Sequence, residues 1–320
     1  NTLKDRAGME KKRILIVGGV AGGATCGARI RRLNEDCEIV IFEMGSYVSF
    51  ANCGLPYFIG DVIVEEEKLL VATPALFENR FNIRVHTDTE VLFIDREHQR
   101  ISVCDLKTSE QRHEHYDALV LSTGSQSVWP DINGLDLPGV HVLRTIPDSR
   151  QIKAQLENIQ RAVVLGAGYL GLELAENLKK TGVEVTVVQS ADQVMHSLDK
   201  EMAAYVADHL QQHGLEIKLS CKATAISQNP DQSLQVSLDS GESVKVDAVM
   251  VSIGVKPRAE LAVQAGLEIG KHGGIRVNEY LQTSDPNIWA VGDVVEVKNV
   301  ITGQWQLFPL AGPANKQGRL

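Results

Sequence analysis

The stretch "RILIVGGVAGG", residues 13 to 23, joins a short, mostly apolar run to a glycine-rich turn. Such a run fits a buried strand of a parallel sheet, and residues 24–33, which follow the turn, have helical character. A second apolar run, residues 38–42, ends in Glu43. A strand, a glycine-rich turn, a helix and a strand that ends in an acid form the fingerprint of dinucleotide binding. The sequence therefore predicts a unit of this kind near its start.

Each part of this pattern has a physical task. Glycines let the backbone turn tightly and approach a pyrophosphate, whose charge is stabilised by the amides at the helix N-terminus. The acid accepts hydrogen bonds from the hydroxyls of a ribose. One departure weakens this copy, because Val20 stands where the middle glycine of the motif is expected.

A second copy, "AVVLGAGYLG" at residues 162 to 171, matches GxGxxG in full. It predicts a helix that runs to Lys180, a stop at Gly182 and a strand over residues 183–188, after which Gln189 takes the place of the acid. Glycines that merely permit a tight turn are the competing interpretation, and two copies with correct flanking elements argue against it. Gln189 carries no charge to repel a 2′-phosphate, but no Arg or Lys follows before Lys200. NADH is therefore favoured over NADPH.

Composition narrows the class of protein. Lys and Arg total 32 against 41 for Asp and Glu, a net charge of −9 with no basic stripe, so nucleic acid is an unexpected partner. No apolar stretch approaches the ~20 residues that span a bilayer. The five cysteines, an odd number, form neither a CxxC pair nor a metal-binding spacing. We expect a cytoplasmic protein with no metal site and no membrane contact, and we expect residues 1–9 to be a disordered tail or an expression scar.

Four further segments complete a known pattern. They are "SFANCGLPYF" at 49–58, "LVLSTG" at 119–124, "TSDPNIWAVGD" at 283–293 and "PLAGPANKQGR" at 309–319. Together with the two glycine-rich turns, they resemble the pyridine nucleotide-disulfide oxidoreductases, which are two-dinucleotide-binding flavoproteins. The cysteine segment and the last segment resemble the single-cysteine branch: coenzyme A-disulfide reductases, NADH-dependent persulfide reductases and NADH oxidases.

The resemblance implies an α/β fold of two Rossmann-like domains, with the NAD domain inserted into the FAD domain. The expected FAD-binding domain comprises 10–147 and 257–320, and the expected NAD(P)H-binding domain 148–256. Members of the family continue into a dimerisation domain that this chain lacks, so we expect the full-length protein to be a homodimer.

The resemblance also implies roles for individual residues, FAD and NADH (or NADPH) as cofactors, and coenzyme A as substrate or bound ligand. Residues expected to hold FAD are Gly18, Val20, Ala21, Gly22, Gly23, Glu43, Val91, Ser122, Thr123, Gly124, Arg144, Glu173, Asp293 and Ala311. Residues expected to hold NAD(P)H are Gly166, Gly168, Gly171, Gln189 and Gly254. Residues expected to bind the coenzyme A substrate are Arg29, Arg32, Ser49, Asn52 and Arg80, although Arg32, like Arg31, stands in a normally polar stretch and could simply be solvated.

Cys53 is the expected catalytic residue. Relatives with a dithiol centre place two cysteines five positions apart, but residues 48 and 58 are Val and Phe. The sulfur partner of Cys53 must then be external: a coenzyme A thiol, a persulfide sulfur or an oxygen atom. Pro56 fits only the first turn of a helix, so a helix should start near Asn52, a good cap residue. Cys53 would then lie at a helix N-terminus, which lowers the pKa of a thiol.

Three functions remain open at this point. The first is a flavin-dependent reductase of coenzyme A disulfide or persulfide, in which NADH reduces the flavin and the electrons pass to sulfur held on Cys53. The second is an NADH oxidase that cycles Cys53 through a sulfenic acid. The third is a flavoprotein without thiol chemistry, a redox-sensing or electron-transfer module, in which Cys53 is a buried and inert cysteine, as we expect for Cys26, Cys37, Cys104 and Cys221.

Overall fold

The computed structural model describes residues 11–320, so the expected tail at 1–9 lies outside the described residues. The chain divides into two compact units. The first unit contains the described residues up to Phe50, then Leu70–Gln126 and Lys256–Leu320, and the second contains Ala51–Leu69 and Ser127–Val255. The division differs from the predicted domains, since 51–69 and 127–147 fall in the second unit. Because the division follows contacts and not the binding of cofactors, the predicted domain boundaries stay a prediction.

A parallel sheet forms the centre of the first unit, in the order β19-β7-β1-β2-β3. Its strands are β1 (Arg13–Val17), β2 (Glu38–Phe42), β3 (Arg84–His86), β7 (Ala118–Leu121) and β19 (Ile288–Ala290). All four pairings are parallel, and Leu15, Ile16 and Ile41 are fully buried. Continuous apolar runs of this kind are expected where a parallel sheet is covered on both faces.

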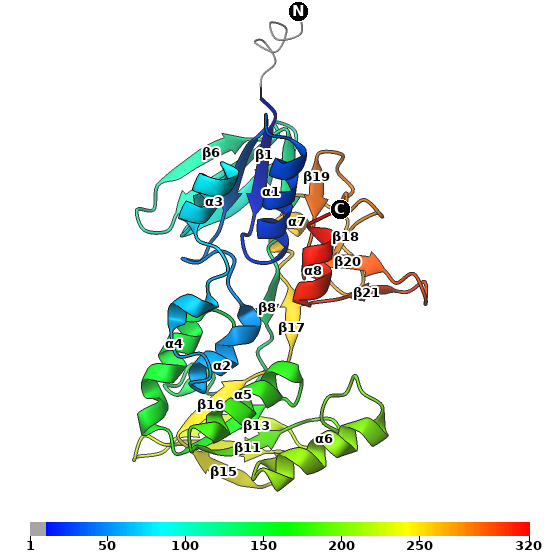
Figure 1. Ribbon diagram of the computed structural model, residues 1–320. Coiled ribbons are helices and arrows are strands. Elements are labelled where there is room, and N and C mark those ends of the chain that lie inside the picture. The colour runs from blue at the N-terminus through cyan, green and yellow to red at the C-terminus, as the bar shows by residue number, and fades with distance from the viewer. Residues whose placement is uncertain (1–10) are drawn as a thin grey trace, which may run out of the picture. The chain divides into compact units, whose positions relative to one another are not determined.

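The remaining elements of the first unit surround this sheet. They are α1 (Gly22–Leu33), α3 (Pro74–Phe81), α7 (Glu260–Gln264), α8 (Ala311–Gln317), the antiparallel sheet of β4 (Thr89–Asp95), β5 (Arg100–Asp105) and β6 (Gln111–His115), and the sheet of β18 (Ile275–Arg276), β20 (Val295–Lys298) and β21 (Trp305–Leu307). The last helix, α8, lies beside α1 (Figure 1). Thr25 Oγ1 donates a hydrogen bond to Asn315 Oδ1 at 2.6 Å between these helices. The end of the sequence therefore packs against the helix that follows the first glycine-rich turn.

A second parallel sheet forms the centre of the second unit, in the order β12-β11-β10-β16-β9. Its strands are β9 (Val140–His141), β10 (Arg161–Leu165), β11 (Glu184–Val188), β12 (Glu216–Lys218) and β16 (Ala248–Val251). The unit also contains α4 (Ile146–Gln155), η3 (Leu156–Asn158), α5 (Tyr169–Lys180), α6 (Lys200–Gln212) and the antiparallel sheet of β13 (Ala223–Gln228), β14 (Leu234–Leu238) and β15 (Ser243–Val246). The boundary between the units falls within the two-stranded sheet of β8 (Ser125–Ser127) and β17 (Val255–Pro257).

The cysteine segment, which we define as residues 51–69, belongs to the second unit. It contains the 3₁₀ turn η1 (Asn52–Gly54), the helix α2 (Leu55–Ile59) and the 3₁₀ turn η2 (Glu66–Leu69). Within this unit α2 packs against α4 and α5 (Figure 1). The thiol and the second glycine-rich turn are thus built on the same unit.

The predicted fold class, an α/β protein with two Rossmann-like parallel sheets, is confirmed. The first two strands have the predicted bounds, but the first helix begins at Gly22 rather than at residue 24. The last two glycines of the motif are thus the first residues of the helix, and Gly23 approaches the turn so closely that only a residue without a side chain fits there. Among the described residues, no helix is long and apolar enough to cross a membrane.

Candidate dinucleotide and thiol sites

The first glycine-rich turn depends on two glycines for its shape. Gly18 has φ +94°, and a Cβ on it would lie 2.1 Å from the carbonyl oxygen of Ser122. A Cβ on Gly23 would lie 1.9 Å from the carbonyl oxygen of Gly18. Both glycines are therefore required for the backbone of β1 to enter α1 directly, whatever the turn binds.

The second turn repeats this geometry. Gly166 has φ +104°, with the site of its missing Cβ 2.3 Å from the oxygen of Ser252, and the corresponding position on Gly171 lies 2.1 Å from the oxygen of Gly166. Gly168 differs, because nothing lies within 4 Å of the place where its Cβ would be. The fold does not require a glycine there, but the close approach of a pyrophosphate does. This open cradle before α5 fits a dinucleotide.

The residues at the ends of the second strands contact these turns in the same way. Glu43 Oε2 accepts a hydrogen bond from the amide of Gly19 at 2.7 Å, and Gln189 Oε1 accepts one from the amide of Ala167 at 3.1 Å. Burial raises the pKa of Glu43, although the amides of Gly19 and Gly45 and the charge of Arg258 lower it. A carboxylate keeps further lone pairs after these bonds, so Glu43 can still accept from a ribose.

The carboxyl ends of β1, β7 and β19 meet at one edge of the first sheet, where ligands bind in open parallel sheets. The site of a Cβ on Gly22 lies 2.9 Å from Ser122 Oγ, and Gly292 lies next to the same hydroxyl. Asp293 follows Gly292 and accepts a hydrogen bond from Ser125 Oγ at 2.8 Å. The predicted turns at Gly18, Ser122 and Asp293 therefore lie together at this edge of the sheet.

Four other predicted FAD residues of the first unit are half-buried or exposed. Thr123 Oγ1 donates to the carbonyl of Arg258 at 2.6 Å, which holds the turn that ends in Gly124 with φ +69°. Val91 is half-buried in β4, and Ala311 is exposed at the first position of α8. Because α8 has only seven residues, its N-terminus alone defines no anion site.

Cys53 is exposed, which excludes the interpretation of a buried cysteine. Of the four cysteines expected to be buried, Cys37 and Cys221 are buried, whereas Cys26 and Cys104 are half-buried. Burial raises the pKa of Cys26 to about 12. The prediction that Asn52 caps an α-helix is wrong. Residue 52 instead begins a 3₁₀ turn, closed by a bond from Gly54 N to Ala51 O at 2.9 Å. The α-helix starts only at Leu55, because the proline at 56 suits its first turn.

Other predicted residues of the second unit lie around the cysteine segment. Asn52 Nδ2 donates a long hydrogen bond, 3.5 Å, to the carbonyl of Arg144. The Tyr57 hydroxyl lies 3.5 Å from Glu173 Oε1. Burial raises the pKa of Glu173, and the negative charge of Glu173 raises the pKa of Tyr57. Sequence reasoning missed Tyr57, although its place four residues after Cys53 puts it about one helical turn further along the same segment.

Gly254, the predicted residue on the nicotinamide side, has φ +117°. Its carbonyl accepts a hydrogen bond from Val128 N at 3.0 Å, and no atom lies within 4 Å of its missing Cβ. As at Gly168, the open space leaves room for a ligand.

Of the four predicted substrate residues of the first unit, two lie together and two lie elsewhere. The guanidinium groups of Arg32 on α1 and Arg80 on α3 lie 5.7 and 5.5 Å from the centre of the Phe81 ring, so they converge on one aromatic side chain. Arg29 Nε instead donates to the carbonyl of Arg319 at 3.2 Å. Ser49 has φ +46°, and its amide donates to Gly19 O, which ties it to the first turn.

Arg31 is not a solvated residue, as the polar stretch around it suggested, but a buried one. Its guanidinium donates to the carbonyls of Phe81 at 2.7 Å, of Cys37 at 2.8 Å and of Asn82 at 2.9 Å. A buried guanidinium needs such acceptors to offset the loss of water. Arg31 therefore joins the end of α1 to the end of α3.

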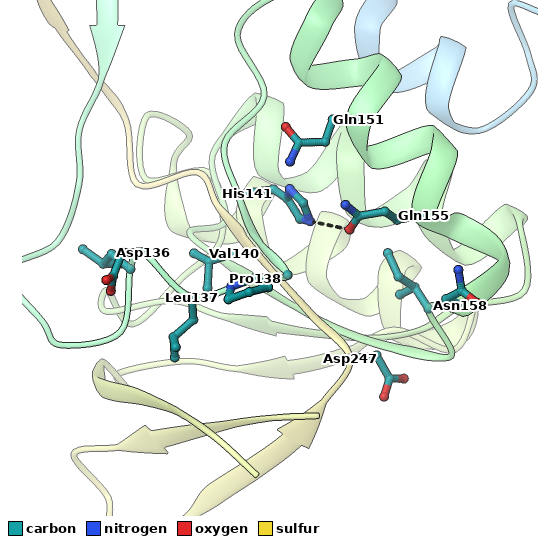
Figure 2. A pocket seen from close by; sticks show the side chains of 12 residues that line it. Asp136, Leu137, Pro138, Val140, His141, Gln151, Gln155, Asn158 and Asp247 are labelled. Carbon is teal, nitrogen blue, oxygen red and sulfur yellow. Dashed lines mark hydrogen bonds between the residues drawn. The ribbon is translucent and has the colours of Figure 1, made fainter. Parts of the chain in front are cut away.

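A cavity of about 560 Å³ lies in the second unit (Figure 2). It is lined by Leu135, Asp136, Leu137, Pro138, Gly139, Val140, His141, Gln151, Gln155, Asn158, Ile159 and Asp247. His141 Nε2 lies 3.1 Å from Gln155 Oε1, and burial lowers the pKa of His141. The predicted dinucleotide and thiol residues are not among those that line it. Over residues 11–320, no cluster of His, Cys, Asp and Glu could hold a metal ion.

Two parallel sheets, each with a glycine-rich turn that enters a helix, define a protein that binds two dinucleotides. The chain belongs to the pyridine nucleotide-disulphide oxidoreductase family, whose profile matches residues 12–318. The family resemblance drawn from the sequence is thus confirmed.

Proteins with assigned names are similar over most of this chain. An NADH oxidase of Methanocaldococcus jannaschii is 38% identical over 96% of this chain and 68% of its own length. An NAD(P)H sulfur oxidoreductase (CoA-dependent) of Pyrococcus furiosus is 36% identical over 97% of this chain and 69% of its own. A coenzyme A disulfide reductase of Staphylococcus aureus is 35% identical over 88% of this chain and 63% of its own.

Among solved structures, the reduced Bacillus anthracis CoADR-RHD is 44% identical, with a TM-score of 0.94. The match covers 97% of this chain and 56% of that protein. The chain therefore spans about half to two thirds of the length of these similar proteins.

Proposed function

We propose that this protein is an NAD(P)H-dependent flavoenzyme that reduces coenzyme A disulfide or coenzyme A persulfide through Cys53. The observation that carries the proposal is an exposed, lone cysteine on the unit that also holds the open cradle at Gly168. The names of the relatives from Pyrococcus furiosus and Staphylococcus aureus support coenzyme A and sulfur as the substrate chemistry.

The two glycine-rich turns would hold the two cofactors. The residues of the first unit from Gly18 to Gly23, with Val20 in the middle, would bind the FAD pyrophosphate, Glu43 its ribose, and Ser122 to Gly124, Asp293, Val91 and Ala311 the rest of the molecule. In the second unit, Gly166, Gly168, Gly171, Gln189 and Gly254 would bind NAD(P)H, and we assign Arg144 and Glu173 to the FAD side. When bound, FAD supplies an acceptor for hydride and a donor of the electron pair.

Cys53 would act as the nucleophile. Its thiolate attacks one sulfur of coenzyme A disulfide, forms a mixed disulfide and releases one coenzyme A thiolate. The electron pair from NAD(P)H then cleaves the mixed disulfide and restores the Cys53 thiolate. The balance is NAD(P)H, a proton and the disulfide going to NAD(P)⁺ and two coenzyme A thiols. With a persulfide, the products are one thiol and hydrogen sulfide.

The coenzyme A phosphates would be bound by the basic side chains of the first unit. Arg32 and Arg80 present two cations beside the Phe81 ring, and Arg29 adds a third on α1. Ser49 and Asn52 are assigned to the end of the substrate that carries the thiol.

The experiment that tests this function compares Cys53→Ser with Cys104→Ser. Cys104 is half-buried in β5 of the first unit, so its serine variant should keep full activity. We expect Cys53→Ser to lose reduction of coenzyme A disulfide and persulfide by at least ~100-fold, as for loss of a covalent nucleophile. The absorbance of the flavin should still bleach with NADH. Turnover that survives in Cys53→Ser would overturn the proposal.

An NADH oxidase is the second candidate, favoured by the name of the Methanocaldococcus jannaschii relative. In that reaction one NADH would reduce oxygen to hydrogen peroxide, which oxidises the Cys53 thiol to a sulfenic acid and releases one water. The electron pair of a second NADH would then reduce the sulfenic acid back to the thiol, with release of a second water. The rates of NADH consumption with oxygen alone and with added coenzyme A persulfide distinguish the two functions. A rate that the persulfide does not raise would favour the oxidase.

Oligomeric state and compartment are also proposed here. We infer that the full-length protein works in the cytoplasm, because a lone exposed thiol persists in a reducing compartment. We infer from membership of the family that it works there as a homodimer. Light scattering of the full-length protein, with and without FAD, tests the dimer.

A further inference from the structure

The cysteine segment is fastened to α4 by Lys153. The Lys153 ammonium donates a hydrogen bond to the carbonyl of Phe58 at 2.8 Å, forms an ion pair with Asp61 at 2.8 Å and lies 4.0 Å from the centre of the Phe58 ring. Lys153 is largely covered, with its side chain 25% exposed. One cation therefore makes three contacts with the end of the helix that follows Cys53.

The hydrogen bond from Lys153 satisfies the Phe58 carbonyl, which has no partner within the short helix α2. The last carbonyls of an α-helix have no partner within the helix, and they carry the negative end of its dipole. In α2, Pro56 O accepts from Gly60 N and Tyr57 O accepts from Val62 N and Ile63 N. The Phe58 carbonyl, which is left to a side chain, accepts from Lys153. A lysine on a neighbouring helix thus takes the place of a C-terminal cap.

Two further contacts hold the same segment on the second unit. A Cβ on Gly60 would lie 2.4 Å from Asn177 Oδ1 and 2.7 Å from Asn177 Cβ, so α2 approaches α5 at a distance that only glycine allows. Arg150, one turn before Lys153 on α4, forms two hydrogen bonds with the Glu66 carboxylate, at 2.9 and 2.6 Å. The segment is therefore fixed at its middle by Lys153 and near its end by Arg150.

We propose that Lys153 is the positioning residue for Cys53. This inference rests on the proposed function for its catalytic readout. Cys53 lies in a 3₁₀ turn directly before a helix of only five residues, too short to hold its own orientation in water. The contacts of Lys153 fix the rotation and the axial position of α2, and with them the direction of the Cys53 thiol relative to α5 and the turn before it.

The test compares Lys153→Met with Lys153→Arg and with Lys245→Met. Methionine keeps the length of the side chain but loses the charge and the hydrogen-bond donors. Arginine keeps the charge and the donors. Lys245 is the matched control, because it forms an ion pair of 2.6 Å with Asp231 on the same unit, away from the segment. All variants are measured as purified flavin-containing protein, with rates expressed per bound flavin.

Two readouts separate positioning from general damage. We expect Lys153→Met to lower kcat for coenzyme A disulfide by about tenfold, because a misaligned nucleophile loses the benefit of orientation. Its KM for NADH and the rate of flavin bleaching by NADH should stay unchanged. Amide hydrogen exchange in a peptide covering residues 51–62 should speed up, while that of α5 should not. Lys153→Arg should restore kcat and the slower hydrogen exchange of the segment. Lys245→Met should match the unmodified protein in both.

The outcomes are decisive in each direction. If Lys153→Met leaves kcat and exchange of the segment unchanged, or if arginine restores neither, the proposal is overturned. If Lys153→Met does not accumulate with flavin, Asp61→Asn, which alters an exposed carboxylate, should give a smaller change of the same kind, and no change would again overturn it. If the unmodified protein lacks disulfide turnover, the proposed function fails, but hydrogen exchange still tests the position of the segment.

Discussion

Gln189 and Glu43 occupy the same place in two copies of one turn, yet they present different groups to a ribose. The Gln189 carbonyl oxygen accepts from Ala167 N, so its amide nitrogen is the group left for the ligand, and that nitrogen is a donor without charge. The Glu43 carboxylate bonds the turn through Gly19 and keeps acceptor oxygens. A donor tolerates the 2′-phosphate of NADPH, whereas a carboxylate repels it.

We therefore predict that Gln189→Glu separates the two coenzymes. The kcat/KM for NADPH should fall by at least ~10-fold, while that for NADH should change by less than about threefold, because the carboxylate still accepts from the ribose hydroxyls. Gln228→Glu, which adds the same charge at an exposed position of β13, is the control. Equal losses with both coenzymes would contradict this account of the site. The measurement is a pair of saturation curves for each variant.

At the scale of elements, the turn between β10 and α5 contains two kinds of glycine. Gly171 serves the fold, since its missing Cβ would lie 2.1 Å from Gly166 O, whereas Gly168 faces open space. We predict that Gly168→Ala folds normally but binds NADH about tenfold more weakly, because a methyl group stands where the pyrophosphate approaches. Gly171→Ala should lose roughly 2–4 kcal/mol of stability, or fail to fold, because of the clash. Fluorescence titration with NADH and thermal unfolding measure the two effects, and a stable Gly171→Ala variant would show that the turn can relax.

The same elements show how far a sequence can be interpreted. Apolar runs and glycine spacing predict β1, β2, β10 and α5 to within two residues, because these signals are local. The membership of the cysteine segment in the second unit is not a local property. It depends on Lys153, Arg150 and Gly60, which contact partners far away in the sequence. For the same reason Arg31 resembles a solvated residue in the sequence and is a buried cross-link in the structure.

In the candidate sites, too, local features could be predicted from the sequence, whereas those that depend on the folded structure could not. The shape of the two turns could be predicted, because the dinucleotide motif fixes both the identity and the order of their residues, while the assignment of these residues to FAD and NAD(P)H stays a prediction. The 3₁₀ turn that starts at Asn52 could not be predicted, because a 3₁₀ turn and an α-helix start with similar residues, and only the bond from Gly54 N to Ala51 O distinguishes them. His141 had no motif around it, and its cavity depends on β9, η3 and the residue after β15, which meet only in the folded unit.

At the scale of the whole molecule, two histidines link stability to pH: the half-buried His86 in the first unit and the buried His141 in the second. Burial is the main cause that lowers the pKa of His86, at the end of β3, and of His141, at the end of β9, below the ordinary value of 6.5. The unfolded chain then takes up protons below about pH 6.5 that the folded chain accepts only at lower pH. Both histidines therefore favour the folded state fully above pH 6.5, and this contribution is lost as the pH falls from there toward their lowered pKa values.

We predict that the melting temperature of the second unit falls between pH 6.5 and pH 5 and that His141→Gln reduces the fall. Glutamine can still hydrogen-bond Gln155 but takes up no proton, so the proton-linked part of the loss disappears. His209→Gln, at an exposed position near the end of α6, is the control. Its melting temperature should fall with pH as much as that of the unmodified protein. Differential scanning calorimetry at several pH values, with hydrogen exchange to assign the unit that opens, gives the measurement. A slope that is the same in His141→Gln and in the unmodified protein would mean that other groups govern the acid sensitivity of this unit.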